Sequence, residues 1–207
     1  MAIIPLERFL TRRFGGVRAG WRTLIGRNWL QRLDRLAGYL THLKEERMDD
    51  LKVTAPAGEP IIIMTRSFKA PRALVWKAMT EREHIARWWG LRSSKLEILE
   101  HDFRVDGGWR YRSTEPDGSS MVFYGQYREI GPIDGFTNTF GIVDMYPDDA
   151  LAERHALEER DGVTHYTAIS RFQTMDARDG MVASGMEGGA RQSLNQLDEL
   201  LAELQQA

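Results

Sequence analysis

Apolar positions in the first part of residues 48–207 follow a strand pattern and then two helical patterns. Ile61–Met64 is a run of mostly β-branched residues, which predicts a strand. Helical spacing follows behind a proline in residues 71–79 and resumes in residues 84–89. Residues 80–83 have the pattern of a capping box, and Gly90 is placed to end the second helix. The sequence therefore predicts a strand followed by two short, consecutive helices.

After Gly90 the apolar residues alternate with polar ones, and turn-forming pairs such as Asp161-Gly162 separate the runs. This alternation predicts six further strands at 95–104, 109–113, 121–130, 136–143, 150–160 and 163–172. From Met186 to Leu204 the apolar residues return to helical spacing, which predicts a long terminal helix. An antiparallel sheet with one apolar face needs a cover, and this helix can supply it. We therefore predict an α+β fold in which a curved antiparallel sheet of about seven strands surrounds the C-terminal helix.

Charge divides the chain into two parts. Residues 1–48 carry ten Lys/Arg and four Asp/Glu, whereas residues 49–207 carry eighteen and twenty-six. We expect a basic helical extension at 1–47 and a main domain at 48–207, for which Met48 would suit as a start. The acidic balance of the main domain argues against a nucleic-acid groove there.

Composition excludes several classes of site. The chain has no cysteine, so disulfides, thiolate metal sites and a cysteine nucleophile are excluded. No apolar run approaches the roughly 20 residues that a membrane span needs. We expect a cytoplasmic protein without a membrane span, because the lack of cysteine fits a reducing compartment.

The N-terminal extension has apolar residues at alternating spacings of three and four from Leu10 to Leu43. This pattern predicts two amphipathic helices or one broken helix, and it is compatible with a homodimer. Its alternatives are a surface helix packed on the domain and an Arg-rich transit peptide. NWLQRLDRLAGYLTHLKEER also resembles the tail helix that follows the winged-helix part of ArsR-type repressors. The winged helix itself is absent, so no DNA-binding activity follows.

Residues 51–204 resemble the SRPBCC superfamily, which has the START-like helix-grip fold, and within it the AHSA-type domains. The latter are homologues of the activator of a heat-shock chaperone ATPase. Lys69 stands where many members have an acidic residue, and Ala190 where many have a bulkier one. The stretches that carry the resemblance are MTRSFKAPRALVWKAMTEREHIARWWG, HDFRVDGGWRYRSTEPDG, YGQYREIGP and SGMEGGARQSLNQLDELL. The resemblance implies an apolar ligand pocket between the sheet and the C-terminal helix.

The candidate ligand-binding residues are the large side chains expected on the inner face. Two neighbouring helical residues point about 100° apart, so we expect one of the two adjacent tryptophans in the core and the other at the pocket. The hydroxyls of the two tyrosines need partners if they are buried. The predicted set is Trp88, Trp89, Trp109, Tyr111, Phe123, Tyr127, Phe140, Met186 and Ala190.

No catalytic set is visible, and we predict no metal and no cofactor. The five histidines lack the i, i+4 spacing of a helical metal site. His155 and His165 could meet across the Asp161-Gly162 hairpin, although half-exposed strand positions are the more common case. Glu97, Asp102 and Asp106 form an acidic cluster, but a catalytic pair would need a desolvated member. Gly185, Gly188 and Gly189 lack the following lysine of a phosphate loop, and they could allow a close approach of helix and sheet or a kink.

Three functions remain open at this stage. The first is binding of a small, largely apolar molecule without catalysis or with weak catalysis. The second is a co-chaperone-like interaction module with a protein partner, which would act in the stress response. The third is a cyclase- or hydrolase-like enzyme of the same superfamily.

Overall fold

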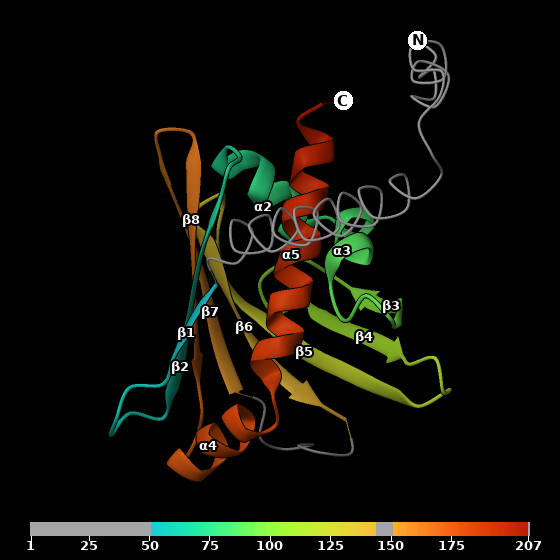
Figure 1. The fold of residues 1–207 in the computed structure, drawn as a ribbon, viewed down its shortest axis with the longest axis vertical. Helices are drawn as coiled ribbons and strands as arrows, with labels where there is room; N and C mark the ends of the chain where they lie inside the picture. Colours follow the sequence, from blue (N-terminus) through green and yellow to red (C-terminus); the bar gives the residue numbers. More distant parts are fainter. Residues whose placement is uncertain (1–50, 144–150, 207) are drawn as a thin grey trace, which may run out of the picture. The chain divides into compact units, whose positions relative to one another are not determined.

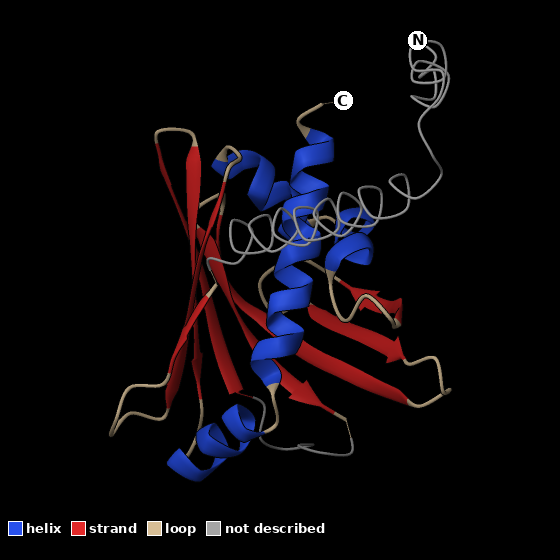
Figure 2. Ribbon diagram, in the orientation of Figure 1, coloured by secondary structure: helices blue, strands red, loops and turns tan. Residues whose placement is uncertain are grey.

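A computed structural model describes residues 51–143 and 151–206, and there it shows one curved sheet with helices on its concave face (Figure 1, Figure 2). The predicted helical extension at 1–47 lies outside the described residues. The strands are β1 (Lys52–Thr54), β2 (Ile61–Phe68), β3 (Lys95–His101), β4 (Gly108–Thr114), β5 (Ser120–Gly131), β6 (Gly135–Ile142), β7 (Leu151–Arg160) and β8 (Val163–Arg171). The helices are α2 (Arg72–Thr80), α3 (Arg82–Trp88), α4 (Met175–Ala183) and α5 (Met186–Leu204).

All neighbouring strands are antiparallel, in the order β1-β2-β8-β7-β6-β5-β4-β3. After β2 the chain passes through α2 and α3 to the far edge at β3. It then returns strand by strand until β8 lies beside β2. This arrangement confirms the predicted α+β helix-grip fold.

Helix α5 crosses the concave face of the sheet, with α2 and α3 near its C-terminal end and α4 at its N-terminal end (Figure 1). Its buried face consists of Leu194, Leu197, Leu200 and Leu201. These leucines join one core cluster with residues of β2, α2 and β8. Truncating a fully buried leucine such as Leu197 to alanine costs roughly 2–5 kcal/mol in comparable cores.

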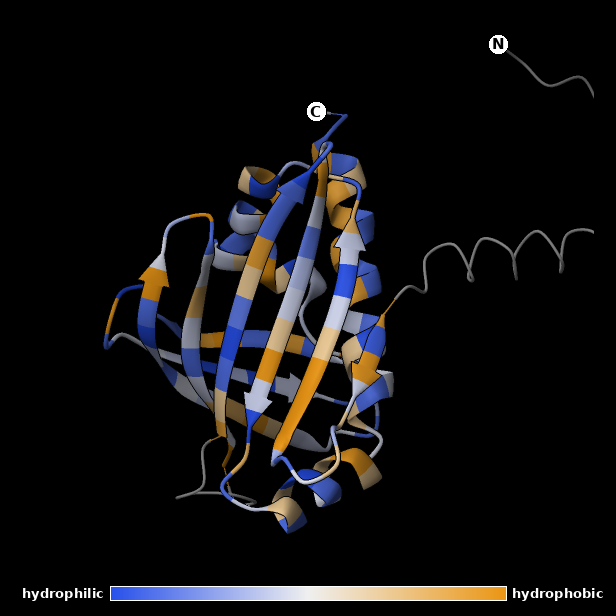
Figure 3. Ribbon diagram, turned by 90° about the vertical axis from the view of Figure 1, so that its left-hand side faces the viewer, coloured by the Kyte–Doolittle hydropathy of each residue, from blue (hydrophilic) through white to orange (hydrophobic). Residues whose placement is uncertain are grey.

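Side chains alternate between the two faces of each strand, and in Figure 3 the strands carry both hydrophobic and hydrophilic segments. Along β8, the inner residues Thr164, Tyr166, Ala168 and Ser170 are buried while their neighbours are more exposed. The inner face of β3 to β6 carries a second cluster around Trp109. The concave face is therefore apolar at both ends of the sheet.

Two elements were missed by the sequence prediction. β1 has three residues, which is too short for alternation to be recognised. α4 contains two aspartates and Gly180, and its one buried residue is Arg178, so it has no apolar stripe. The Arg178 guanidinium donates to the carbonyls of Pro56 and Glu59, both at 3.0 Å, which anchors α4 through polar contacts.

The predicted capping box at residues 80–83 is wrong. Thr80 is the last residue of α2, and its hydroxyl donates to the Trp76 carbonyl at 2.8 Å. The N-cap of α3 is Glu81, which makes no side-chain capping bond. The two helices follow each other directly, so Thr80 serves the end of one helix rather than the start of the next.

The strand predicted at 95–104 is shorter than expected. β3 ends at His101 and has a register shift between Ile98 and Glu100. Asp106 has a φ of 61°, in the left-handed region, and begins the reversal into β4.

Candidate functional site

The adjacent tryptophans at the end of α3 have different environments. Trp88 is buried in the main core, and its Nε1 donates to the Ala78 carbonyl at 2.9 Å. Trp89 is half-buried, and its ring meets Tyr111 and Phe123 edge-on at centroid distances of 5.4 and 4.9 Å. Trp89 therefore connects α3 to the aromatic inner face of β4 and β5.

Trp109, Tyr111 and Tyr127 are buried in this inner face, whereas Phe123 and Phe140 are half-buried. We call these five residues and Trp89 the aromatic wall. The wall is continuous, because Trp109 contacts Tyr111 at 5.0 Å and Phe140 at 5.8 Å between ring centroids. Gly125 makes room for Trp109, since a Cβ at this glycine would lie 2.5 Å from the indole Nε1.

The two wall tyrosines find their hydroxyl partner within the protein. His101 Nδ1 lies 2.9 Å from the Tyr111 hydroxyl and 3.4 Å from that of Tyr127, and its Nε2 donates to the Thr80 carbonyl at 2.8 Å. Burial raises the pKa of Tyr111 to about 12 and that of Tyr127 further. Desolvation lowers the pKa of His101. All three groups are therefore neutral near pH 7.

Met186 and Ala190 lie on the N-terminal half of α5, where both are half-buried against the main core. The glycines between them do not serve a close approach of helix and sheet. A Cβ at Gly188 would meet no atom within 4 Å, and one at Gly189 would lie 3.7 Å from Leu91 Cδ2. The expected close approach is therefore not formed at these two glycines, because an added Cβ would meet no strand residue within 4 Å.

A cavity of about 110 Å³ lies between α4 and the adjoining ends of β6, β7 and β8. Phe140 lines this cavity and is also part of the aromatic wall. An apolar cavity of similar size can hold a small aromatic ring. The lining residues are Phe140, Gly141, Ile142, Leu151, Phe172, Gln173, Thr174, Ala177 and Met181.

A polar cluster that was not predicted from the sequence lies on the inner face of β6, β7 and β8. Asn138, Glu153 and Ser170 face one another in register across these three strands. Glu153 Oε1 accepts from the Ser170 hydroxyl at 3.0 Å, and its Oε2 lies 3.4 Å from Asn138 Nδ2. We call these three residues the polar row. The pattern L-x-E-x-H-x-L from Leu151 to Leu157 contained the signal, because alternation places the acidic residue on the same face as the leucines.

His155 extends the polar row toward Tyr166. Its Nε2 lies 3.7 Å from Glu153 Oε2, and its Nδ1 lies 2.8 Å from the Tyr166 hydroxyl. Burial raises the pKa of Glu153, but contacts with His155, Ser170 and Asn138 outweigh this and hold it below the ordinary value. Burial also raises the pKa of Tyr166. The cluster thus holds an ionised carboxylate in an otherwise apolar interior.

His155 and His165 do not meet across the Asp161-Gly162 hairpin. His155 faces the interior, whereas His165 is exposed on the other face and lies 3.1 Å from the Ser67 hydroxyl. The strand register pairs His165 with Glu158 and His155 with Ala168. Because Glu158 and His155 are three residues apart on β7, this register places the two histidines on opposite faces of the sheet.

The acidic cluster predicted at Glu97, Asp102 and Asp106 is open to solvent. Glu97 pairs with Arg112 at 2.9 Å, and Asp102 pairs with Arg104 at 2.7 Å. All three carboxylates are partly or largely exposed. A desolvated acid–base pair is therefore not formed by these residues.

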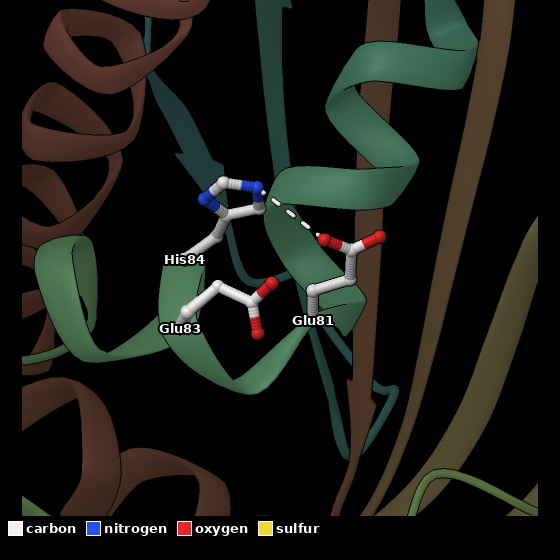
Figure 4. Close-up of side chains that lie close together, drawn as sticks. All are labelled: Glu81, Glu83 and His84. Carbon is white, nitrogen blue, oxygen red and sulfur yellow. Dashed lines mark ion pairs between the residues drawn. The ribbon is translucent and has the colours of Figure 1, made fainter.

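Glu81, Glu83 and His84 lie close together at the start of α3 (Figure 4), with one potential ligand atom from each within 4.8 Å of the others. His84 Nε2 lies 3.4 Å from Glu81 Oε2, and Lys77 Nζ lies 3.8 Å from the same oxygen. Glu83 is exposed, and backbone hydrogen bonding at the helix start lowers its pKa. Glu81 is therefore the member of this group that both the lysine and the histidine approach.

Among the described residues, no helix is long and apolar enough to cross a membrane. The structure resembles several solved bacterial proteins. A protein from Arthrobacter aurescens is 26% identical, with a TM-score of 0.68 over 73% of this chain and 91% of its own. The protein Ms6760 from Mycobacterium smegmatis is 24% identical, with a TM-score of 0.67 over 72% and 95%. An AHSA1 protein from Silicibacter pomeroyi is 19% identical, with a TM-score of 0.57 over 69% and 97%; this likeness and that to Ms6760 show the fold alone.

A search of curated proteins finds no match. A family model described as "Activator of Hsp90 ATPase homolog 1-like protein" matches residues 69–202. This range includes the aromatic wall, the polar row and all of α5 except its last two residues. The chain therefore belongs to the AHSA1 family, as the resemblance of its sequence predicted.

Proposed function

We propose that the chain binds a small, largely apolar molecule between the sheet and α5. Membership of the AHSA1 family supports a ligand-binding or interaction domain in general. Further support is the largely apolar cavity of about 110 Å³, which α4 rather than α5 borders and which Phe140 lines among the nine predicted residues. Apolar pockets with a few polar groups are the usual form of small-molecule sites.

The predicted residues take two roles in this proposal. Four of them are buried and support the side chains that would contact the ligand. They are Trp88, Trp109, Tyr111 and Tyr127. The other five are half-buried on the concave side of the sheet, so part of each side chain can still contact another molecule. They are Trp89, Phe123, Phe140, Met186 and Ala190. The ligand would contact these five residues and extend into the cavity.

The test is a thermal-shift screen of the full chain with lipidic, polyketide-like and aromatic compounds. We expect at least one class to raise the melting temperature in proportion to its concentration. Met181→Trp should abolish this response, because the indole would fill the cavity. Val182→Trp is the matched control, since Val182 is the next residue of α4 and 48% exposed.

The absence of stabilisation by every class would contradict the proposed function. If the chain is instead an interaction module, a pull-down from native cells should yield a stoichiometric protein partner, and Met181→Trp should still bind that partner.

We further propose that residues 1–47 form a homodimer contact.

A further inference from the structure

We propose that Glu153 and Asn138 form a subsite that binds the protonated amine of an otherwise apolar ligand. This inference rests on the proposed function, because the apolar body of such a ligand would occupy the cavity. It adds the chemical class of the polar group that the ligand carries.

The polar row lies directly beside the cavity. Phe140 and Leu151, which line the cavity, form a register pair across β6 and β7. Asn138 and Glu153 form the next inward-facing pair along the same strands. Residues two positions apart on a strand are separated by roughly 7 Å. A polar group one or two carbons from an aromatic ring in the cavity would therefore reach the carboxylate.

Two acceptor atoms of the subsite lack full hydrogen bonds. Asn138 is 4% exposed, and its Oδ1 is buried without a partner. Its Nδ2 donates to the Thr139 carbonyl at 3.0 Å and approaches Glu153 Oε2 only to 3.4 Å. Strong hydrogen bonds from nitrogen to oxygen are about 2.7–3.2 Å long. Both Asn138 Oδ1 and Glu153 Oε2 could thus accept a further donor.

The charge of Glu153 is poorly matched by its surroundings. Among the described residues, the one basic group within ion-pair distance is His155, at 3.7 Å. The other ring nitrogen of this histidine, Nδ1, lies 2.8 Å from the Tyr166 hydroxyl. The buried Arg66 of β2 is held elsewhere, by Asn195 at 2.6 Å and Asp198 at 3.8 Å. A cation is therefore the group that this site lacks.

The subsite is also accessible in part. Glu153 keeps 16% and His155 13% of their side-chain surface exposed, although both lie on the inner face. An ammonium group offers three donors and a positive charge, whereas a hydroxyl offers one donor and a carboxylate offers none. Charge-assisted hydrogen bonds are about twice as strong as neutral ones. The geometry consequently favours an amine over an alcohol, and an alcohol over an acid.

The experiment uses three probes of one shape, 2-phenylethylamine, 2-phenylethanol and phenylacetate, titrated into the full chain at pH 7.5. The chain carries ¹³C-methyl methionine, and Met181→Leu assigns the Met181 signal at the cavity wall. We expect each bound probe to shift this signal. The amine should bind about tenfold tighter than the alcohol, which is the ratio of a modest charge pair.

Glu153→Gln should weaken amine binding about tenfold and change alcohol binding by less than about twofold. Glu158→Gln is the matched control, because Glu158 lies on the same strand but is exposed and pairs with Arg160 at 2.7 Å. Circular dichroism checks that each variant is folded. The comparison of probes on the unaltered chain requires no variant.

Equal affinity of the unaltered chain for amine and alcohol would overturn the subsite and leave the proposed function intact. An amine preference that survives Glu153→Gln would also overturn it. Failure of all three probes and of the wider screen would overturn both proposals together.

Discussion

Gly125 is the residue on which the aromatic wall depends most directly. A Cβ there would lie 1.8 Å from the Thr139 carbonyl oxygen and 2.5 Å from Trp109 Nε1. The first neighbour is backbone, so it cannot rotate away as a flexible side chain would. The absence of a side chain at this position therefore allows both the β5–β6 pairing and the position of the indole.

Gly125→Ala should lower the free energy of unfolding by about 3 kcal/mol, at the upper end of typical overpacking costs. Gly180→Ala is the control, for which we expect the free energy of unfolding to rise rather than fall. Gly180 lies within α4, and an added Cβ would meet nothing within 4 Å, so we expect a gain of roughly 0.5–1 kcal/mol. Urea denaturation measures both, and a neutral Gly125→Ala would show that the strands can shift without cost.

His101 should make the stability depend on pH between 7.5 and 5.5. Desolvation lowers its pKa in the folded state, so the unfolded chain binds a proton near pH 6.5 before the folded chain does. Stability must then fall as the pH drops below this value. It should fall less in His101→Gln, which keeps a donor for Thr80 and an acceptor for Tyr111 but does not titrate.

Denaturation midpoints at the two pH values measure this difference. Most carboxyl groups titrate below pH 5.5, so a change in stability between pH 7.5 and 5.5 reports mainly on histidine protonation. Identical pH dependence in the variant and the unaltered chain would assign the effect to another histidine.

At the scale of elements, α3 is held to α5 by a polar clasp made of Ser193 and Gln196. The Gln196 amide donates to the carbonyls of Trp88 at 3.1 Å and Gly90 at 2.9 Å. Ser193 Oγ accepts from the Gly90 amide at 2.9 Å and donates to the Gly90 carbonyl at 3.1 Å. The clasp fixes the end of α3 and with it the position of Trp89.

Gln196→Ala should cost about 1–2 kcal/mol, because the Trp88 carbonyl loses its side-chain donor and the Gly90 carbonyl keeps the Ser193 hydroxyl as its side-chain donor. Hydrogen exchange should increase first in residues 82–90. The control is Gln192→Ala, one turn earlier on the same helix, whose single contact with the Arg92 amide is 3.4 Å long. A global change without local exchange in α3 would contradict a specific role of the clasp.

At the scale of the whole molecule, the open question is what residues 1–47 add. Their apolar spacing predicts a self-associating helix, whereas the described core begins at Leu51. We expect residues 48–207 to fold alone and the deletion to turn a dimer into a monomer. Light scattering after size exclusion gives both masses, and an unchanged mass would remove the dimer role.

Local patterns were enough to predict most of the fold. The predicted strand at 163–172 and the observed β8 at Val163–Arg171 nearly coincide, because alternation and the Asp161-Gly162 turn are encoded within a few residues. β1 and α4 were missed because neither has a periodic apolar face. The capping box failed because the same four residues also suit a helix end.

Sequence patterns alone were sufficient for the order of the longer elements and for the family, whereas β1 and α4 were not predicted. Only the tertiary structure decided which inner residues meet. Asn138, Glu153 and Ser170 are far apart in the chain and face one another through strand register, which depends on the pairing of all three strands. The cavity beside them depends in addition on α4, a helix whose position comes from polar contacts of Arg178 rather than from an apolar pattern.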